Sequence, residues 1–167
     1  MIINKQSIFL LKTTSISVTN SFIKNFKEKF ILVSNRDKLY YAEIFFLAAW
    51  IRFCIYFFPF KFYKNTLGKL QEEAVQEIST EAMAFALNIK NIVLTVCNHT
   101  PWESKCLVQA IICKKILKRS GIKSTIYLGV KNDNNKKLLA HAWLKFGDKI
   151  LTGGAGHKEF NVVNFYG

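Results

Sequence analysis

Acidic residues are scarce in this chain, and the sequence patterns of several protein classes are missing from it. Its 167 residues include 11 Asp and Glu against 24 Lys and Arg, a formal net charge of +13. A positive surface suits an acidic peptide, an anionic lipid or a nucleic acid. The lysines are scattered, however, and do not gather with aromatic residues into a recognisable nucleic-acid module. We therefore predict no nucleic-acid partner, and the chain shows no internal repeat or low-complexity tract.

Cysteine is also sparse, and its spacing excludes two further classes. Cys54, Cys97, Cys106 and Cys113 lie in or beside apolar, helix-like stretches. They have neither the spacing of a zinc site nor the framework of a disulfide-rich secreted domain. The apolar run at residues 8–11 is too short for a signal peptide, and no small-residue cleavage site follows it. The sequence predicts no metal or other cofactor, and a location in the reducing cytoplasm.

Half of the residues are apolar, which is enough for one domain with a proper core. We expect a partly helical N-terminal extension over residues 1–38 and the domain over residues 39–167. Between residues 20 and 33, apolar residues recur at helical spacing among lysines. This is the pattern of a basic amphipathic helix that packs on the domain or a partner, or lies at a membrane surface.

The most hydrophobic stretch, residues 39–58, predicts a long helix that Pro59 ends. Its length approaches the roughly 20 residues that a bilayer span requires. Glu43 and Arg52 argue against a span, because a charged side chain at mid-membrane costs about 2.5 kcal/mol or more. We expect these two residues on the exposed side of the helix and its aromatic residues over the core, with peripheral membrane contact as an open alternative.

The rest of the chain predicts helices followed by a sheet. Residues 69–88 place apolar side chains on one helix face and glutamates on the other, and residues 89–98 predict a further helix. Residues 122–130 and 138–146 alternate as strands do, and residues 150–153 would complete an antiparallel meander. The predicted fold class is α+β.

Residues 104–119 form the clearest predicted helix. Ser104 is expected to cap it, cations gather toward its end, and Gly121 follows. Apolar residues on all sides of its first two turns predict a buried, central helix. Cys106 would lie in the first turn, where unpaired N–H groups and the helix dipole favour a thiolate and could bind the oxyanion of an attacked carbonyl. Taken alone, Cys106 would be an ordinary core residue.

A histidine in the strand at residues 138–146 changes that interpretation. The alternation points His141 and Trp143 to the same side of the strand. Histidine is the side chain best suited to accept a thiol proton near neutral pH and return it to a leaving group. A strand histidine alone is usually structural, but with Cys106 it predicts a nucleophile and its general base.

Four other residues are weaker candidates for the site. His99 lies in a turn and would have to fold back toward the cysteine, and His157 lies in the C-terminal tail. Trp102 could wall the site or steer the oxyanion, although packing over the helix start is the simpler interpretation. Gln109, one turn beyond the cysteine, could bind a substrate carbonyl or the backbone, and we favour the backbone.

The residues also resemble a known family. The runs PWESKCLVQA, KKILKRSGIKSTIYLGV and AHAWLKFGDKILTGG together resemble the stand-alone leader peptidase of lasso-peptide biosynthesis, of the transglutaminase-like (papain-like) superfamily. An upstream run, AEIFFLAAWIRFCIYFFPFKFYKNTLG, resembles that family's hydrophobic N-terminal helix. The resemblance covers roughly residues 39–154 and implies a transglutaminase-like fold with Cys106 as nucleophile and His141 as general base.

The same resemblance implies a reaction and its partners. Such an enzyme cuts the leader from a ribosomally made precursor peptide through an acyl-enzyme. A separate leader-recognition protein holds the leader, and a lasso cyclase of the asparagine-synthetase type closes the ring on the freed amine. Residues before Leu39 are too few for a fused recognition domain, which favours a separate partner. Two alternatives stay open: a transglutaminase-like acyl transferase, and a basic peptide- or membrane-binding scaffold without catalysis.

The sequence departs from the superfamily at the third catalytic position. Members commonly carry an Asp on the strand after the His, where it fixes the imidazole tautomer. Here that strand reads ILTGG, with no carboxylate. If Gly147 and Asp148 form a two-residue hairpin turn, His141 lies opposite Gly154 and diagonal to Thr152, which could orient it weakly.

Other groups could take the place of the missing Asp. A backbone carbonyl, or the carboxylate of Asp133 or Glu159 from a loop, are the alternatives. Asp148 should lie at the turn, too far along the strand, so its role is turn chemistry. A Cys–His dyad would remain workable, because the base needs an orienting partner but not necessarily a charged one.

Overall fold

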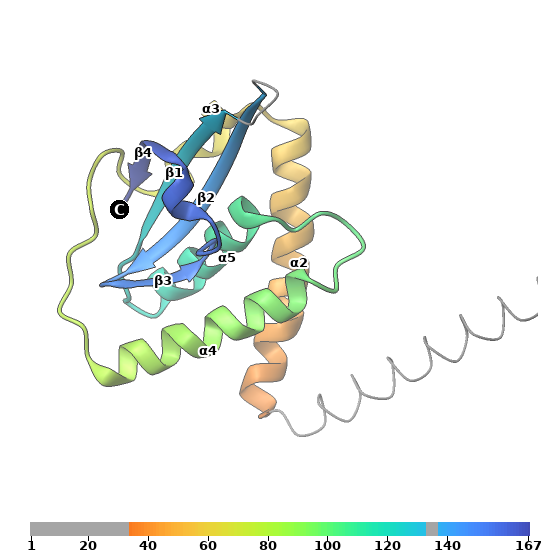
Figure 1. Ribbon diagram of the computed structural model, residues 1–167. Helices are drawn as coiled ribbons and strands as arrows, with labels where there is room; N and C mark the ends of the chain where they lie inside the picture. Colours follow the sequence, from red (N-terminus) through yellow and green to blue (C-terminus); the bar gives the residue numbers. More distant parts are fainter. Residues whose placement is uncertain (1–33, 133–136) are drawn as a thin grey trace, which may run out of the picture. The chain divides into compact units, whose positions relative to one another are not determined.

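The computed structural model describes residues 34–132 and 137–167 (Figure 1). It divides into two compact units, Met1–Leu39 and Tyr40–Gly167, and the site described below belongs to the second. The helix expected at residues 20–33 lies outside the described residues. In chain order the elements are α2 (Asn35–Phe57), α3 (Phe60–Tyr63), the 3₁₀ turn η1 (Lys64–Leu67), α4 (Thr80–Cys97), α5 (Cys106–Arg119), β1 (Thr125–Asn132), β2 (Leu138–Phe146), β3 (Lys149–Thr152), the 3₁₀ turn η2 (His157–Glu159) and β4 (Asn161–Tyr166).

The strands form one antiparallel sheet in the order β3-β2-β1-β4. The predicted meander is therefore confirmed, and the tail adds a fourth strand that the sequence did not indicate. Gly147 and Asp148 form the predicted two-residue turn between β2 and β3, with Gly147 in the left-handed region at φ +55°. On β1, Gly129 is paired with His141 of β2.

The core lies between α5, the sheet and the other two long helices. Helix α5 packs against β2 and against α4, as Figure 1 shows. Helix α2 contributes Ile44, Ala48 and Ile51, which are spaced to share one helix face. The apolar interior of α5 is buried as expected, and its members are Val108, Ala110, Ile112, Cys113, Ile116 and Leu117. The fold class is α+β, as predicted.

The helix predicted at residues 69–88 is wrong in its first half. Residues 71–79 form no helix, and α4 begins only at Thr80, where Ser79 Oγ accepts a hydrogen bond from the Ala82 N–H. The preceding segment lies along the sheet: Lys69 exchanges backbone hydrogen bonds with Gly167, and the Gln71 N–H donates to the Phe165 carbonyl. Pairing with a distant strand thus overrides the local helix pattern.

The charged residues of α2 stay partly exposed and pair with other parts of the domain. Glu43 accepts two hydrogen bonds from Arg119 of α5, at 2.5 and 2.8 Å, and Arg52 contacts Glu103 at 3.4 Å. These pairs tie α2 to the domain. The aromatic residues of α2 were expected over the core, but most of them are exposed, and only Tyr40 and Tyr41 pack against the core. Helices α2 and α4 are long and apolar enough to cross a membrane by length and composition alone, a test that core helices also pass.

Lys114 is the one cation of α5 that does not reach solvent. Its Nζ donates to the carbonyls of Ser124, at 2.5 Å, and Tyr166, at 2.9 Å. The sequence grouped it with the cations toward the helix end, but it is buried and ties α5 to the residue before β1 and to the last residue of β4. Burial, and to a smaller extent the charge of Lys118, lowers the pKa of the Lys114 ammonium from 10.5 to about 8.

We expect Lys114→Met to destabilise the fold at pH 10 by about 1–3 kcal/mol, because two buried carbonyls lose their donor. The unfolded chain binds the Lys114 proton up to pH 10.5 and the folded chain only up to about 8, so the fold gains stability as pH rises between these values. The wild-type advantage should therefore shrink as pH falls from about 10.5 to 8 and stay constant below 8. Urea titrations at pH 7, 8.5 and 10 measure this.

Exposed Lys115 provides the matched control. Lys115→Met should change the free energy of unfolding by no more than about 0.5 kcal/mol at any of the three pH values. An advantage of wild type over Lys114→Met that is independent of pH would contradict the prediction.

Candidate active site

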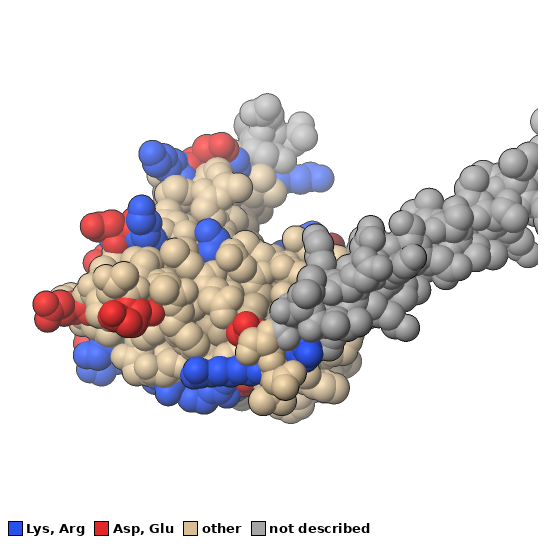
Figure 2. Space-filling model, turned by 90° about the horizontal axis from the view of Figure 1, so that it is seen from below, with Lys and Arg blue, Asp and Glu red and all other residues tan. Residues whose placement is uncertain are grey.

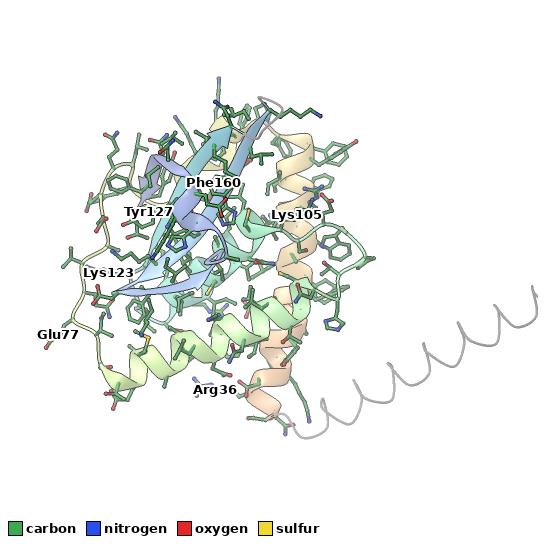
Figure 3. All side chains as sticks on the ribbon, viewed as in Figure 1. Arg36, Glu77, Lys105, Lys123, Tyr127 and Phe160 are labelled. Carbon is green, nitrogen blue, oxygen red and sulfur yellow. The ribbon has the colours of Figure 1, made fainter. Side chains whose placement is uncertain are left out.

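Cys106 occupies the first position of α5 and is half-buried. The residue before it, Lys105, is the N-cap and makes no side-chain cap bond; Figure 3 labels it where the loop from α4 enters α5. Ser104, the predicted cap, instead shares a 2.8 Å hydrogen bond with Thr100. Among the described residues, no cap side chain therefore occupies the N–H groups around Cys106, which leaves them for an oxyanion.

The loop before α5 is held by its own hydrogen bonds. Gln109 Nε2 donates to the Ser104 carbonyl at 2.9 Å, so this side chain binds the backbone, the alternative that we favoured. The Trp102 ring packs on Phe45 of α2, with ring centroids 5.2 Å apart. Both contacts hold the loop that leads to Cys106, and neither brings Gln109 or Trp102 to the sulfur.

His141 is held between two aromatic rings. Its ring centroid lies 4.9 Å from that of Phe160, labelled in Figure 3, and 6.0 Å from that of Trp143. Its Nε2 lies 2.8 Å from the Gly153 carbonyl oxygen. A carbonyl can only accept, so Nε2 carries the proton and Nδ1 keeps the lone pair that a general base needs.

Cys106 and His141 line the same cavity. Its volume is about 360 Å³, and its remaining lining residues are Phe60, Leu107, Leu128, Gly129, Val130, Ala140, Ala142, Val163 and Asn164. The walls are mainly apolar. At Gly129 a Cβ would lie 2.9 Å from Phe160 and from the Trp143 ring, so glycine is required for these rings to pack over the strands.

The two residues are not hydrogen-bonded to one another within the described part of the chain. The alternation of β2 places His141 and Trp143 on one face of the sheet, whereas Leu144 and Phe146 belong to the core on the face that α5 covers. The cavity is where the helix start and the histidine come together. Direct pairing of the sulfur with the imidazole stays a prediction.

Comparison with known proteins shows to which family the chain belongs. A model of the transglutaminase-like superfamily matches residues 59–164, which is more than half of the chain and contains both Cys106 and His141. The chain belongs to the transglutaminase-like superfamily. Its α+β architecture fits the papain-like fold of these cysteine-peptidase-like and acyltransferase-like proteins. No curated protein and no solved structure matches the chain.

Thr152 does not take the place of the superfamily's aspartate. The β2–β3 pairing shifts by one residue between Leu144 and Lys145, so Thr152 is paired with Leu144 on the core face. A shift of one residue turns a strand side chain to the other face, away from His141. Its hydroxyl is buried and has no hydrogen-bond partner among the described residues. The same shift brings the Gly153 carbonyl to the imidazole.

The other predicted orienting groups lie elsewhere or outside the described residues. Glu159 pairs with Lys131 at 2.5 Å, Asp148 lies in the hairpin turn, and Asp133 falls outside the described residues. Sequence reasoning named a backbone carbonyl only as a general alternative. The sequence feature that could have indicated Gly153 is the Gly-Gly pair directly after β3. Gly153 has a left-handed backbone, at φ +69°, which glycine adopts without strain.

The rival histidines are bound to nearby carbonyls outside the cavity lining. His99 Nδ1 lies 2.6 Å from the Thr95 carbonyl oxygen, and His157 Nδ1 lies 2.6 Å from that of Gly154. The His157 ring also packs 5.8 Å from the Trp143 ring. Both contacts are structural, which leaves His141 as the histidine of the cavity.

Two of the other three cysteines differ from Cys106 in exposure, because Cys97 and Cys113 are buried. Burial raises the pKa of Cys97 to about 11 and the pKa of Cys113 to about 12, so both thiols stay protonated near neutral pH. Cys54 is half-buried, like Cys106. All four are free thiols, and alkylation can therefore compare them within one sample.

We expect iodoacetamide at pH 7.5 to modify Cys106 and Cys54 in the folded protein and to leave Cys97 and Cys113 unmodified, because a buried, protonated thiol does not react. Peptide mass mapping after short exposures measures each site, and a urea-unfolded sample should show all four modified. Modification of Cys113 before Cys106 would contradict the placement of Cys106 on an accessible cavity.

Proposed function

We propose that the protein is a cysteine peptidase that removes the leader from a ribosomally made lasso precursor peptide, with Cys106 as nucleophile and His141 as general base. The observation that carries the proposal is that both residues line one cavity at the start of α5. Membership of the superfamily supports the cysteine chemistry. The resemblance of residues 39–154 to lasso leader peptidases supports the substrate.

The first step forms the acyl-enzyme. Nδ1 of His141 takes the thiol proton of Cys106, directly or through one water molecule, and the sulfur attacks the scissile carbonyl carbon. The oxyanion is stabilised by the open N–H groups at the start of α5. Contacts between a thiol and its base are often long without substrate and shorten when substrate binds.

The second step releases the two products in turn. As the C–N bond breaks, the His141 imidazolium gives its proton to the leaving amine, which is the new N-terminus of the core peptide. Water then attacks the thioester, His141 takes the proton of that water, and the thiolate leaves and recovers a proton as the leader carboxylate departs. A separate leader-recognition protein and a lasso cyclase are the proposed partners.

A neutral carbonyl replaces the usual carboxylate in this scheme. The Gly153 carbonyl holds the Nε2–H of His141 and so fixes the tautomer. Phe160 packs on the ring and limits the access of water to that hydrogen bond. Because a carbonyl carries no full charge, it stabilises the imidazolium less than a carboxylate would.

Acyl transfer to an amine is the second candidate, because the superfamily match includes acyltransferase-like proteins. The same thioester would then react with an amine in place of water. The two reactions differ in product mass, since hydrolysis adds the mass of water and transfer does not.

We expect Cys106→Ala and His141→Ala each to lower leader removal by about a thousandfold or more, because the dyad acts as a unit. Cys54→Ala and His99→Ala are the matched controls and should cleave like wild type. The assay is mass spectrometry of a precursor co-expressed with candidate partner proteins. Normal cleavage by Cys106→Ala, with the fold intact by circular dichroism, would end the peptidase proposal.

We expect Gly153→Ala to lower kcat/KM by about tenfold to a hundredfold, less than the ~10⁴ lost when a triad aspartate is neutralised. A Cβ there would lie 2.1 Å from the Ala142 carbonyl oxygen, which must displace the carbonyl that orients His141. Gly154→Ala is the control, since its Cβ meets Ile150 at an ordinary 3.5 Å.

The pH profile of kcat/KM distinguishes an orienting role for Gly153 from a structural one. Loss of the Nε2–H acceptor should shift the ascending limb of the Gly153→Ala profile, while Gly154→Ala keeps the wild-type limb. Equal activity and equal profiles for the two variants would contradict the assignment of the Gly153 carbonyl.

A further inference from the structure

An outward-facing group of aromatic rings lies on α2 and α3, apart from the core. We call six of these residues the aromatic surface: Trp50, Phe53, Tyr56, Phe57, Phe58 and Phe62. Their exposed fractions run from 45% for Phe53 to 76% for Tyr56. Exposed apolar residues scattered singly are ordinary, but a contiguous group marks an interaction site.

The rings of the aromatic surface are contiguous. Phe53 lies at its centre, with ring centroids 5.9 Å from Trp50, 4.5 Å from Phe57 and 6.3 Å from Phe58. Tyr56 contacts Phe57 at 5.0 Å, and Phe62 contacts Phe58 at 6.4 Å. The opposite side of α2 is already used, since its Ile44, Ala48 and Ile51 are in the core.

The segment that carries the aromatic surface has charges of one sign. Residues 44–67 contain no Asp or Glu, and their cations are Arg52, Lys61 and Lys64. Arg52 pairs with Glu103, whereas Lys61 and Lys64 are exposed. Lys61 Nζ lies 5.8 Å from the centre of the Phe62 ring, so aromatic and cationic groups are interleaved.

A cavity of about 380 Å³ adjoins the aromatic surface. Trp50, Cys54 and Ile55 of α2 form one wall, and Ile111 and three lysines of α5 form another. The lysines are buried Lys114 and exposed Lys115 and Lys118, and the lining contains no carboxylate. Because Lys115 and Lys118 are exposed and no carboxylate lines this cavity, an anion at its opening would meet positive charge that the lining does not neutralise.

We propose that the aromatic surface, with Lys115 and Lys118 beside it, docks the protein on the surface of a bilayer that contains anionic phospholipids. Rings that combine an apolar body with a polar tip, as in Trp and Tyr, suit the boundary between headgroups and acyl chains. Lysines next to them suit lipid phosphates. An apolar protein partner would account for the rings but not for the lysines beside them or for the absence of carboxylates from residues 44–67 and from the lining of the adjoining cavity.

Docking would bring the catalytic cavity toward the bilayer. Phe60 of α3 is 37% exposed, follows Phe58 of the aromatic surface by two residues, and lines the cavity of Cys106 and His141. The proposal does not require the peptidase assignment, because a noncatalytic protein would dock in the same way.

The test is co-sedimentation of the full-length chain with vesicles of phosphatidylcholine alone or with 30% phosphatidylglycerol. We expect binding to the anionic vesicles that exceeds binding to neutral ones by about tenfold or more and weakens at high salt. Lys115→Glu with Lys118→Glu should lower binding by about tenfold or more. Trp50→Ser with Phe57→Ser should do the same, since both side chains are exposed and their loss spares the core.

Matched variants exclude general effects of charge and hydrophobicity. Lys149→Glu with Lys158→Glu makes the same change in net charge at exposed positions outside the cavity lining, and Val75→Ser with Leu87→Ser removes exposed apolar groups elsewhere. Both controls should bind anionic vesicles like wild type.

Three outcomes would overturn the proposal. The first is no binding to anionic vesicles, as expected if a protein, a second copy or another segment of this chain covers the rings. The second is equal binding to neutral vesicles. The third is equal loss in the matched variants, which would show a nonspecific effect of net charge. Cleavage of soluble precursor without vesicles is scored separately, so failure of docking and failure of the peptidase proposal are distinct results.

Discussion

The burial of α5 determines the position of its first residue, and the candidate site depends on that position. An N-terminus without a side-chain cap loses about 1 kcal/mol relative to a capped one. Val108 and Ala110, within the first turns, are 3% and 0% exposed, and burying a valine side chain stabilises by about 1.5–3 kcal/mol. Packing can therefore hold the helix start that capping does not. Because buried side chains hold the helix start, no cap side chain is needed there, and the N–H groups around Cys106 stay open.

The one-residue shift in the β2–β3 pairing exchanges one orienting group for another. Regular pairing from the Gly147–Asp148 turn would place Thr152 on the side of His141. The shift turns Thr152 into the core beside Leu144 and presents the carbonyl of Gly153 to the imidazole. A carbonyl fixes the tautomer as well as a carboxylate does, but it adds no charge to balance the imidazolium. The rings of Phe160 and Trp143 beside the imidazole limit water there, which makes that single hydrogen bond stronger than it would be in solvent.

Local patterns predicted the elements whose structure is set by local contacts. The strand at residues 138–146, the Gly147–Asp148 turn and the α5 helix all follow from periodicity and turn chemistry within a few residues. Two failures involve distant partners. Residues 69–79 look helical alone, but Lys69 and Gln71 pair with the C-terminal end of the chain, and Lys114 looks like a helix-end cation but binds the carbonyls of Ser124 and Tyr166. Neither partner can be read from the neighbouring sequence, because each belongs to a segment that only the folded sheet brings near.

The same limit explains why the rings of α2 were placed incorrectly. They were expected inside, with the charges of the helix outside, as on an ordinary amphipathic helix in water. Glu43 and Arg52 are partly exposed and have charged partners on α5 and on the loop before it, but the buried residues of α2 are small or aliphatic and most of its rings are exposed. Rings that the core does not admit remain on the surface. Exposing such a surface to water is unfavourable. The outer face of α2 is therefore better suited to an apolar environment bordered by groups that bind basic side chains than to bulk water.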